Sequence, residues 1–250
     1  MSNTNGNSSE TAIHLSLQGK GGVGKSLLAS ILAQYFGDRR RTVRCMDTDP
    51  VNRTLSQYRA LQVERIQLVE DGNRINQRGF DVLMERFLTE SGVTFVVDNG
   101  ASTFLPLWHY MLENNALGLL RDEGRQIYVH TVVTGGQALT DTLNGFAALA
   151  KTAQDRSIIV WVNEYFGRVE AEGKPFHEMA AYRDNSGKVA GSISVMRRNP
   201  DTFGRDVEEM VSRKLTFEEA LGMPEFSLMS RQRLRVVQRD LFEQLDALSL

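Results

Sequence analysis

Short apolar runs alternate along the chain with stretches in which apolar residues recur every three or four positions. The short runs predict strands at 13–17, 42–46, 93–97, 126–133, 157–162 and 189–195. The stretches with helical spacing predict helices at 27–36, 80–88, 105–117 and 138–147. A run that is apolar throughout, such as 93–97, is typical of a parallel strand buried on both faces. The alternation predicts a three-layer α/β fold with a mostly parallel central sheet.

Several segments between these elements have weaker patterns. Leu55, Tyr58 and Leu61 suggest a short helix, 66–69 suggests a short strand, and Asp71-Gly72-Asn73 is a turn signal. Residues 164–188 are polar and dotted with glycine, so we expect a long excursion from the core with a helix at 176–182.

Two or three helices are expected to finish the chain. Thr216 and Glu219 have the spacing of a capping box, which predicts a short helix that ends near Gly222. An apolar stripe that includes Leu234, Leu241 and Leu245 predicts a C-terminal helix at about 228–248.

The ends of the chain and its composition limit the class of protein. Residues 1–10 are polar and have no apolar core of a secretory signal, so we expect a disordered lead-in before one domain at 11–250. No apolar run approaches the roughly 18 residues that span a bilayer. The single cysteine, Cys45, suits a reducing compartment such as the cytoplasm. A net charge of −2 provides no global attraction for nucleic acid.

The segment Gly19-Lys20-Gly21-Gly22-Val23-Gly24-Lys25-Ser26 lies between the first predicted strand and the first predicted helix. Its pattern, G-x-x-x-x-G-K-[ST], is that of a phosphate-binding loop in the context that such a loop requires. Its glycines allow backbone N–H groups to turn inward around a phosphate chain, at the positive end of the following helix. Lys25 would reach the β- and γ-phosphates, and the Ser26 hydroxyl would hold Mg²⁺.

Acidic residues follow two of the predicted strands. Asp98 ends the strand 93–97, at the sheet edge where ligands bind in open α/β folds, and can hold a water of the Mg²⁺ shell. Asp47 and Asp49 close the second strand at the same edge and would point the same way if the chain stays extended. One of them would serve the metal and the other would orient the attacking water. The alternative for this pair is an ordinary Asp-Pro turn.

Lys20 adds a second cation to the loop. Lys25 already supplies the lysine that the motif needs, so Lys20 suits the neutralisation of charge that develops during phosphoryl transfer. Lys20 would act within its own chain or be donated across a dimer.

These residues resemble the deviant Walker A loop of the ParA/MinD superfamily of ATPases. Asp47-Thr48-Asp49-Pro50 is similar to its first switch and Asp98-Asn99-Gly100 to its second. The resemblance implies an ATP-sandwich dimer with Mg²⁺, in which Lys20 reaches the partner's nucleotide and Asp49 positions water. It implies that the loop residues Gly21, Gly22, Val23, Gly24, Lys25, Ser26 and Leu27 contact nucleotide, that Asp47 serves the metal with Ser26, and that Asp98 completes the catalytic set.

The resemblance also covers the base of the nucleotide. Asn163 lies where the family's adenine-reading Asn usually lies, and 196–200, which includes Arg197, is similar to the loop that closes over the base. Leu27 departs from the family because a second Thr is common at that position, so one α-phosphate contact is lost or comes from backbone.

Within the superfamily, 49–55, 163–167 and 202–204 look most like the TraL/StbB-type ATPases of conjugative plasmids. This narrower resemblance implies a switch that serves plasmid transfer or stability, with a protein partner from that machinery. Two rival functions remain open: a nucleotide-gated scaffold with little hydrolysis, and an ATP-dependent DNA partition motor.

The basic residues of the C-terminal helix are compatible with the DNA partition motor and with a protein or membrane partner. Arg231, Arg233, Arg235 and Arg239 accompany its apolar stripe, which allows contact with a membrane or a partner. Docking on the chain's own domain is the favoured interpretation, because most amphipathic helices dock in this way. Arginines in a first helical turn oppose the helix dipole, so an acidic neighbour is expected. For Arg39, Arg40 and Arg41, a solvated turn is favoured over a nucleic-acid patch.

Overall fold

The computed structural model of the chain describes residues 10–70, 74–248 and 250. The predicted lead-in, apart from Glu10, and the turn predicted at 71–73 lie outside these residues.

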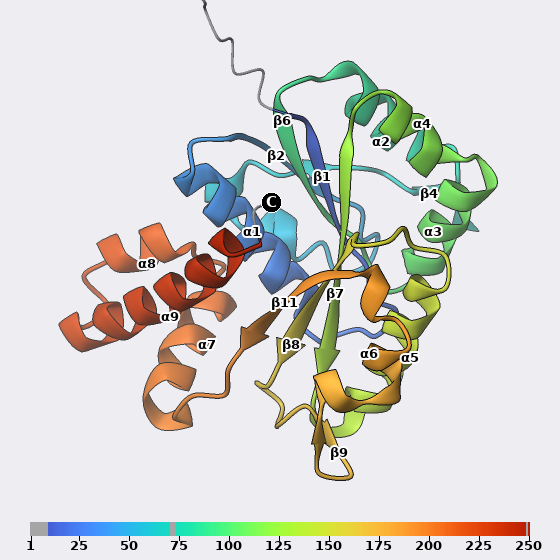
Figure 1. Cartoon of the computed structure of the whole chain (residues 1–250). Coiled ribbons are helices and arrows are strands. Elements are labelled where there is room, and N and C mark those ends of the chain that lie inside the picture. The colour runs from blue at the N-terminus through green and yellow to red at the C-terminus, as the bar shows by residue number, and fades with distance from the viewer. Residues whose placement is uncertain (1–9, 71–73, 249) are drawn as a thin grey trace, which may run out of the picture.

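A seven-stranded sheet forms the centre of the fold (Figure 1), and every strand pair in it is parallel. The strand order is β11-β8-β7-β1-β6-β2-β3. The strands are β1 (Ala12–Ser16), β2 (Thr42–Asp47), β3 (Glu64–Arg65), β6 (Val93–Asp98), β7 (Gln126–Thr134), β8 (Ile158–Asn163) and β11 (Val189–Val195). Two small antiparallel hairpins accompany the sheet: β4 (Val69–Glu70) with β5 (Arg74–Ile75), and β9 (Glu170–Ala171) with β10 (Lys174–Pro175). The mostly parallel sheet predicted from the apolar runs is confirmed.

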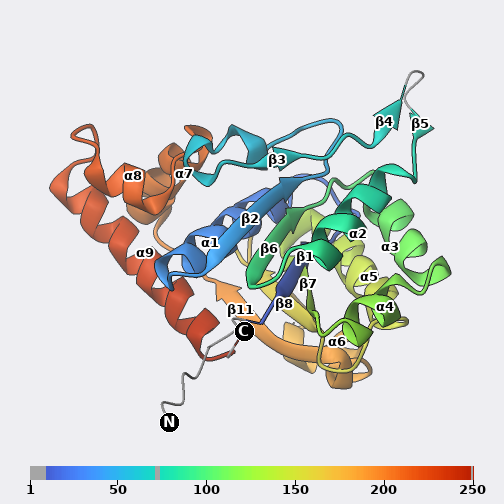
Figure 2. The same cartoon turned by 90° about the horizontal axis from the view of Figure 1, so that it is seen from above.

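Helices cover both faces of this sheet, so the fold has the three layers that the pattern predicted (Figures 1 and 2). One apolar cluster packs the sheet against α2 (Gly79–Thr89), α3 (Phe104–Glu113), α4 (Ala116–Asp122), α5 (Leu139–Ala150) and α6 (Ala180–Arg183). The other cluster packs it against α1 (Lys25–Asp38), α7 (Arg205–Ser212), α8 (Phe217–Gly222) and α9 (Leu228–Asp246). Neighbouring residues of one strand face opposite clusters: Val160 belongs to the first and Trp161 to the second.

Four local predictions differ from the structure. The strand predicted at 66–69 is absent, because the chain leaves the sheet after Ile66 and enters the β4–β5 hairpin. The helix predicted at 105–117 is two helices, since Asn115 takes a left-handed conformation (φ 48°). The helix predicted over 55–61 is two 3₁₀ turns, Leu55–Gln57 and Arg59–Leu61, separated by an extended Tyr58. In the excursion, an extended Met179 separates the turn Phe176–Glu178 from α6.

The last three helices dock on the α1 face of the sheet. The predicted capping box is present at the start of α8, where Thr216 and Glu219 bond each other's backbone. In α9, the apolar stripe is buried, as the docking interpretation predicted: Leu234, Leu241 and Leu245 are each at most 4% exposed. The acidic neighbour expected for the arginines of α9 is Asp206, whose carboxylate lies 2.5 Å from Nε of Arg233.

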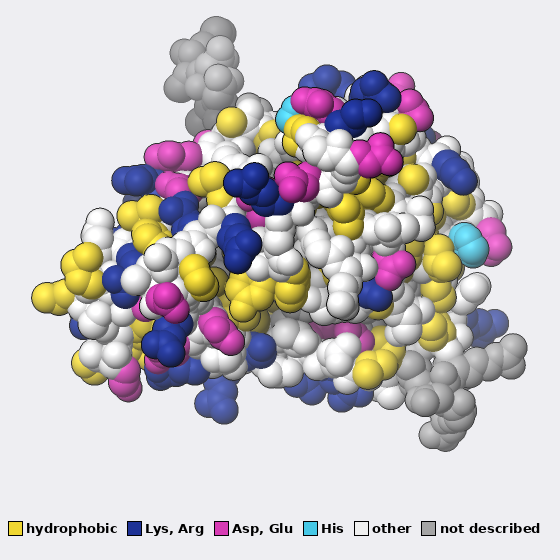
Figure 3. All heavy atoms as spheres, turned by 90° about the horizontal axis from the view of Figure 1, so that it is seen from below, with side chains coloured by type: hydrophobic (Ala, Val, Ile, Leu, Met, Phe, Trp, Pro, Cys, Tyr) yellow, Lys and Arg dark blue, Asp and Glu magenta, His cyan; other side chains and the backbone are white. Residues whose placement is uncertain are grey.

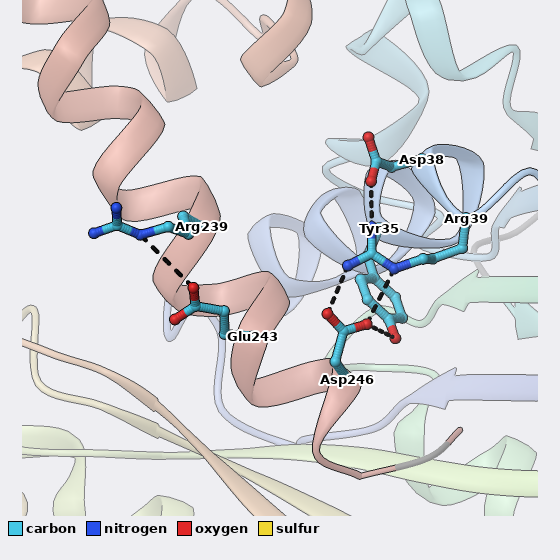
Figure 4. A network of polar contacts seen from close by, with 6 residues as sticks. All are labelled: Tyr35, Asp38, Arg39, Arg239, Glu243 and Asp246. Atoms are coloured by element: carbon cyan, nitrogen blue, oxygen red, sulfur yellow. Dashed lines mark hydrogen bonds and ion pairs between the residues drawn. The ribbon is translucent and has the colours of Figure 1, made fainter.

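The C-terminal end of α9 is also tied to the end of α1 (Figure 4). The Tyr35 hydroxyl donates to Asp246 Oδ1 at 2.9 Å, and Arg39 Nη2 lies 2.6 Å from Asp246 Oδ2. Burial, with the carboxylate nearby, raises the pKa of Tyr35 to about 12, so its hydroxyl keeps the proton that it donates. Among the described residues, no helix is both long enough and apolar enough to cross a bilayer.

Candidate functional site

The loop between β1 and α1 is shaped to receive an anion. Gly22 (φ 75°) and Gly24 (φ 106°) take backbone conformations that residues with a side chain rarely adopt. Around Gly21 and Gly22 there is open space on the side where a Cβ would lie. α1 begins at Lys25 with no side-chain cap and no acidic residue in its first turn. The first N–H groups of the helix therefore remain available to a phosphate.

Lys25 lies back over this loop. Its side chain is largely buried, and Nζ donates to the Lys20 carbonyl at 2.9 Å. Burial lowers the pKa of Lys25, while the nearby carboxylates of Asp98 and Asp49 raise it. The structure thus brings Lys25 to the predicted acids.

Asp98 and Ser26 meet beside Lys25. Burial raises the pKa of Asp98 to about 7, while a hydrogen bond with Ser26 and the charge of Lys25 act in the opposite direction. Asp98 Oδ1 is buried and has no hydrogen-bond partner among the described residues. A buried acceptor without a partner costs free energy, so a ligand that brings a donor, such as a metal-bound water, suits this position.

Asp47 and Asp49 lie at the same edge but their carboxylates engage different neighbours. Asp47 is buried and accepts the N–H groups of Asp49 and Ser56, each at 3.0 Å; burial raises its pKa and these two hydrogen bonds lower it. Thr48 still donates its N–H to Asp98 of β6, and the chain bends at 50–51. Asp49 accepts from the N–H groups of Val51 (2.8 Å) and Asn52 (3.1 Å). The Asp-Pro turn that was the alternative is therefore present, and it lies beside the predicted acids.

The segments around Asp49 and Asp98 touch each other. A Cβ on Gly100 would lie 2.7 Å from Asp49 Cγ, so only glycine permits this approach. Asn99 Oδ1 accepts from the Thr48 hydroxyl at 2.8 Å and from the Thr103 hydroxyl at 3.0 Å. The sequence placed Asn99 in the segment that resembles the second switch, but its contact with the first segment depends on the neighbouring positions of β2 and β6.

Asn163, at the end of β8, reaches the phosphate loop from the other side. Its Nδ2 donates to the Val23 carbonyl at 3.0 Å, and its Oδ1 accepts the N–H of Tyr165 at 3.1 Å. An apolar cavity of about 310 Å³ opens beyond it. The lining of this cavity includes Tyr165, Met196, Arg197, Phe203, Val207 and Leu241. The predicted base-closing loop thus lines a cavity next to Asn163.

Lys20 forms an ion pair with an acid outside the predicted set. Its Nζ lies 2.7 Å from Oδ2 of Asp141, on the first turn of α5, and both side chains are about half exposed (45% and 53%). Phe166 lines a small cavity with Lys20 and Gly22. Asp141 belongs to no sequence motif, and the run 163–167 that contains Phe166 gave no sign of a place beside Lys20; the packing of α5 and of the 164–168 loop brings both residues here.

The donor set fits magnesium bound together with a nucleotide. Within the described ranges, no group of three or more His, Cys, Asp or Glu residues is arranged to hold a metal ion by itself. Mg²⁺ does not require such a group, because it keeps several waters and takes one or two protein ligands beside the phosphates. Ser26, Asp47 and the partnerless oxygen of Asp98 meet that lower requirement.

Figure 3 views the face to which β7 and β8 point. Basic and acidic side chains are interspersed across it. This mixture agrees with the net charge of −2 and differs from the single-sign surface that binds nucleic acid strongly.

Residues 16–218 match the CobQ/CobB/MinD/ParA nucleotide-binding domain family. The chain belongs to this family. A TraL protein of Escherichia coli is 48% identical over 236 residues, which are 94% of this chain and 97% of that protein. The predicted ParA/MinD and TraL resemblance is therefore confirmed.

Solved structures show the same fold. MinD of Pyrococcus horikoshii OT3, complexed with Mg-ADP, has a TM-score of 0.57 at 17% identity, with 96% of this chain and 97% of that chain covered. A chain of the MinC:MinD cell division protein complex of Aquifex aeolicus has a TM-score of 0.51 at 14% identity, with 93% and 96% covered. The three-layer P-loop NTPase fold is confirmed.

Proposed function

We propose that this protein is a cytoplasmic, Mg²⁺-dependent ATP-binding and hydrolysing switch that serves plasmid transfer or stability. The observation that carries the proposal is the pair of buried residues Lys25 and Asp98, which meet the half-buried Ser26 at the mouth of an open phosphate loop. A buried lysine beside a partnerless carboxylate oxygen is costly without a ligand, and Mg-ATP supplies both the phosphates and the metal-bound water that this cluster lacks.

Each part of the nucleotide has a place on the chain. The N–H groups of 21–27 hold the phosphates, and Lys25 neutralises their charge. Mg²⁺, when bound, withdraws charge from the phosphate oxygens, and Ser26 with Asp47 would hold it. The cavity lined by Met196, Arg197 and Phe203 has the apolar walls that suit a purine.

Hydrolysis requires a positioned water and a further positive charge. Asp49 is assigned the water, because it lies within electrostatic reach of Lys25 and because Gly100 lets the two switch segments meet. Lys20 is assigned to neutralise the transition-state charge on the nucleotide of a second copy. Its half-exposed side chain pairs with Asp141 in its own chain and is therefore not occupied by its own phosphate site. ATP-dependent dimerisation would exchange this ion pair for a contact across the interface.

The cellular role rests on the TraL relative and on the TraL/StbB-type motifs at 49–55 and 163–167. A role in plasmid transfer implies that the ATP-bound dimer is recognised by a protein of the transfer or stability machinery.

Steady-state ATP turnover tests the enzymatic part. We expect Lys25→Ala and Asp49→Ala to reduce turnover by about 10²-fold or more, because each removes a group that acts on the reacting phosphate. Asp49→Ala should still bind a fluorescent ATP analogue. Lys151→Ala, at an exposed position directly after the C-terminal end of α5, is the matched control and should keep the wild-type rate. Equal rates in all four proteins would refute hydrolysis at this site. ATP binding without turnover in the wild type would favour the scaffold.

A further inference from the structure

The outer edge of β2 is only partly covered by the sheet. On one side, β2 pairs with β6 along its whole length, from Thr42 to Asp47. On the other side, β3 pairs only with Met46 and Asp47. The first half of β2 therefore forms an open edge of the central sheet.

Two hydrogen bonds establish which backbone groups face this open edge. Asp47 accepts from Ile66 on the β3 side at 3.0 Å, and the N–H of Thr48 donates to Asp98 on the β6 side at 2.9 Å. Because the backbone groups of successive strand residues point to opposite sides, Val43 and Cys45 face outward, as Asp47 does. β3 pairs only with Met46 and Asp47, and no loop or turn bonds to these groups, so the N–H and C=O of Val43 and the N–H of Cys45 have no backbone partner there among the described residues.

A groove of about 690 Å³ runs alongside these groups. Its walls come from the end of α1, the turn Arg59–Leu61 and α8, which lie around β2 in Figure 2. Val43, Cys45, Ala33, Leu61 and Leu221 give it an apolar part, and Glu218 stands on its α8 wall. Charged side chains of both signs complete the lining: Asp38, Arg41, Arg44 and Glu64. Asp38 and Arg44 form ion pairs with residues outside the groove, Arg39 and Glu90. Glu218 forms no ion pair with any described residue, whereas Glu64, at the same groove, is paired with Arg86 at 3.1 Å.

At the opposite edge of the sheet, a side chain occupies outward-facing backbone groups of the strand. On β11, the side-chain amide of Gln244 accepts from the N–H of Ser194 at 2.7 Å and donates to its carbonyl at 3.2 Å. This side chain from α9 takes the place of a neighbouring strand. Native proteins commonly cover their edges in such ways. One edge of this sheet is thus capped from within, and the other presents free strand groups inside a groove.

We propose that the β2 edge groove, lined by Val43, Cys45, Leu61, Leu221 and Glu218, binds an extended segment of a partner protein, which adds to the sheet as a strand. Backbone hydrogen bonds to Val43 and Cys45 provide affinity, and alternate side chains enter the groove. The segment carries apolar side chains against Leu61 and Leu221 and a lysine or arginine opposite Glu218. The site is separate from the phosphate loop, so it does not depend on the nucleotide proposal.

Amide hydrogen exchange of the free protein tests the edge geometry first. The amides of Val43 and Cys45 should exchange at least tenfold faster than those of Arg44 and Met46, which bond to β6. Equal protection at all four amides would overturn the proposal, because no free strand groups would remain.

A phage-displayed library of random linear decapeptides tests binding. Peptides selected on the wild-type protein should carry alternating apolar residues and a basic residue, and should slow exchange at Val43 and Cys45. Val43→Pro removes an N–H that points out of the sheet, at an edge position where a strand tolerates proline. This substitution should weaken the binding of the selected peptides about tenfold. Leu221→Arg should abolish binding, and Glu218→Lys should weaken it.

The matched control is Leu228→Arg, at a leucine that is 79% exposed and does not line the groove. It should bind the selected peptides as tightly as the wild type does. The proposal is overturned if no peptide is enriched, if the enriched peptides bind Leu221→Arg equally well, or if edge pairing between two copies protects Val43 and Cys45 instead.

Discussion

The imidazole of His130 is fully buried between two other polar rings. Trp161 Nε1 can only donate, so its 3.0 Å bond makes His130 Nδ1 an acceptor. The remaining proton of a neutral His130 then lies on Nε2 and is donated to His14 Nδ1, 2.9 Å away. His14 Nε2 has no partner among the described residues. Full burial and mutual hydrogen bonding assign these two strand histidines a structural role in the core.

Burial makes the stability of this core pH-dependent. It lowers the pKa of His130 to about 3 and that of His14 well below its ordinary value. Below about pH 6.5 the two imidazoles bind protons in the unfolded chain but stay neutral in the folded chain. Their contribution to the free energy of unfolding is therefore fully present above that pH and is lost as the pH falls toward 3. Each histidine contributes a slope of about 1.4 kcal/mol per pH unit below about pH 6.

Urea unfolding at pH 7.5 and pH 5.0 measures this slope. His130→Gln should lose less stability between the two pH values than the wild type does. His109→Gln, at an exposed histidine, should behave as the wild type. A wild-type slope in His130→Gln would contradict the assignment.

Single residues of the candidate site differ in how far they could be predicted. The loop residues were predictable because they form a contiguous motif, and Asp98 was predictable because it directly follows an apolar strand. The Lys20–Asp141 pair was not predictable, since 120 positions of sequence separate partners that only the fold brings within 2.7 Å. The functional roles of all these residues stay predictions until they are measured.

Among the elements, the strands of the central sheet and the C-terminal helix were predictable from their apolar patterns, whereas the segments at 55–61, 66–69, 105–117 and 176–182 were not. The last strand, 189–195, has the bounds of β11, and the C-terminal helix expected at about 228–248 is α9, Leu228–Asp246. The strand expected at 66–69 is wrong because the chain leaves the sheet after Ile66, and Leu68 is buried by tertiary contacts outside any strand. A short apolar run indicates that its side chains are buried, but it does not indicate whether the segment pairs with a neighbouring strand.

Truncation of the α9 stripe tests whether this helix is part of the core. Leu245 is fully buried, so Leu245→Ala should lower the free energy of unfolding by about 2–4 kcal/mol. Leu228→Ala, at the exposed start of the same helix, should change it by less than about 0.5 kcal/mol. Urea denaturation measures both. A small effect at Leu245 would contradict docking and return α9 to a role at a membrane or a partner.

At the scale of the whole molecule, the parallel sheet assembles the candidate site. β1 is central, between β6 and β7, so its loop lies beside Asp98 on one side and near Asn163, two strands away, on the other. The alternating pattern predicted that strand ends would meet at one edge, because parallel strands all point the same way. The strand order could not be read from the pattern, since it depends on how each helix crosses the sheet.

Sedimentation velocity with Mg²⁺ and either ADP or a non-hydrolysable ATP analogue tests the central claim most directly. We expect the 28.1 kDa chain to sediment as a monomer with ADP and at twice that mass with the ATP analogue. Lys25→Ala should remain monomeric with both nucleotides. The same mass with both nucleotides in the wild type, or a dimer that forms without nucleotide, would contradict an ATP-controlled switch.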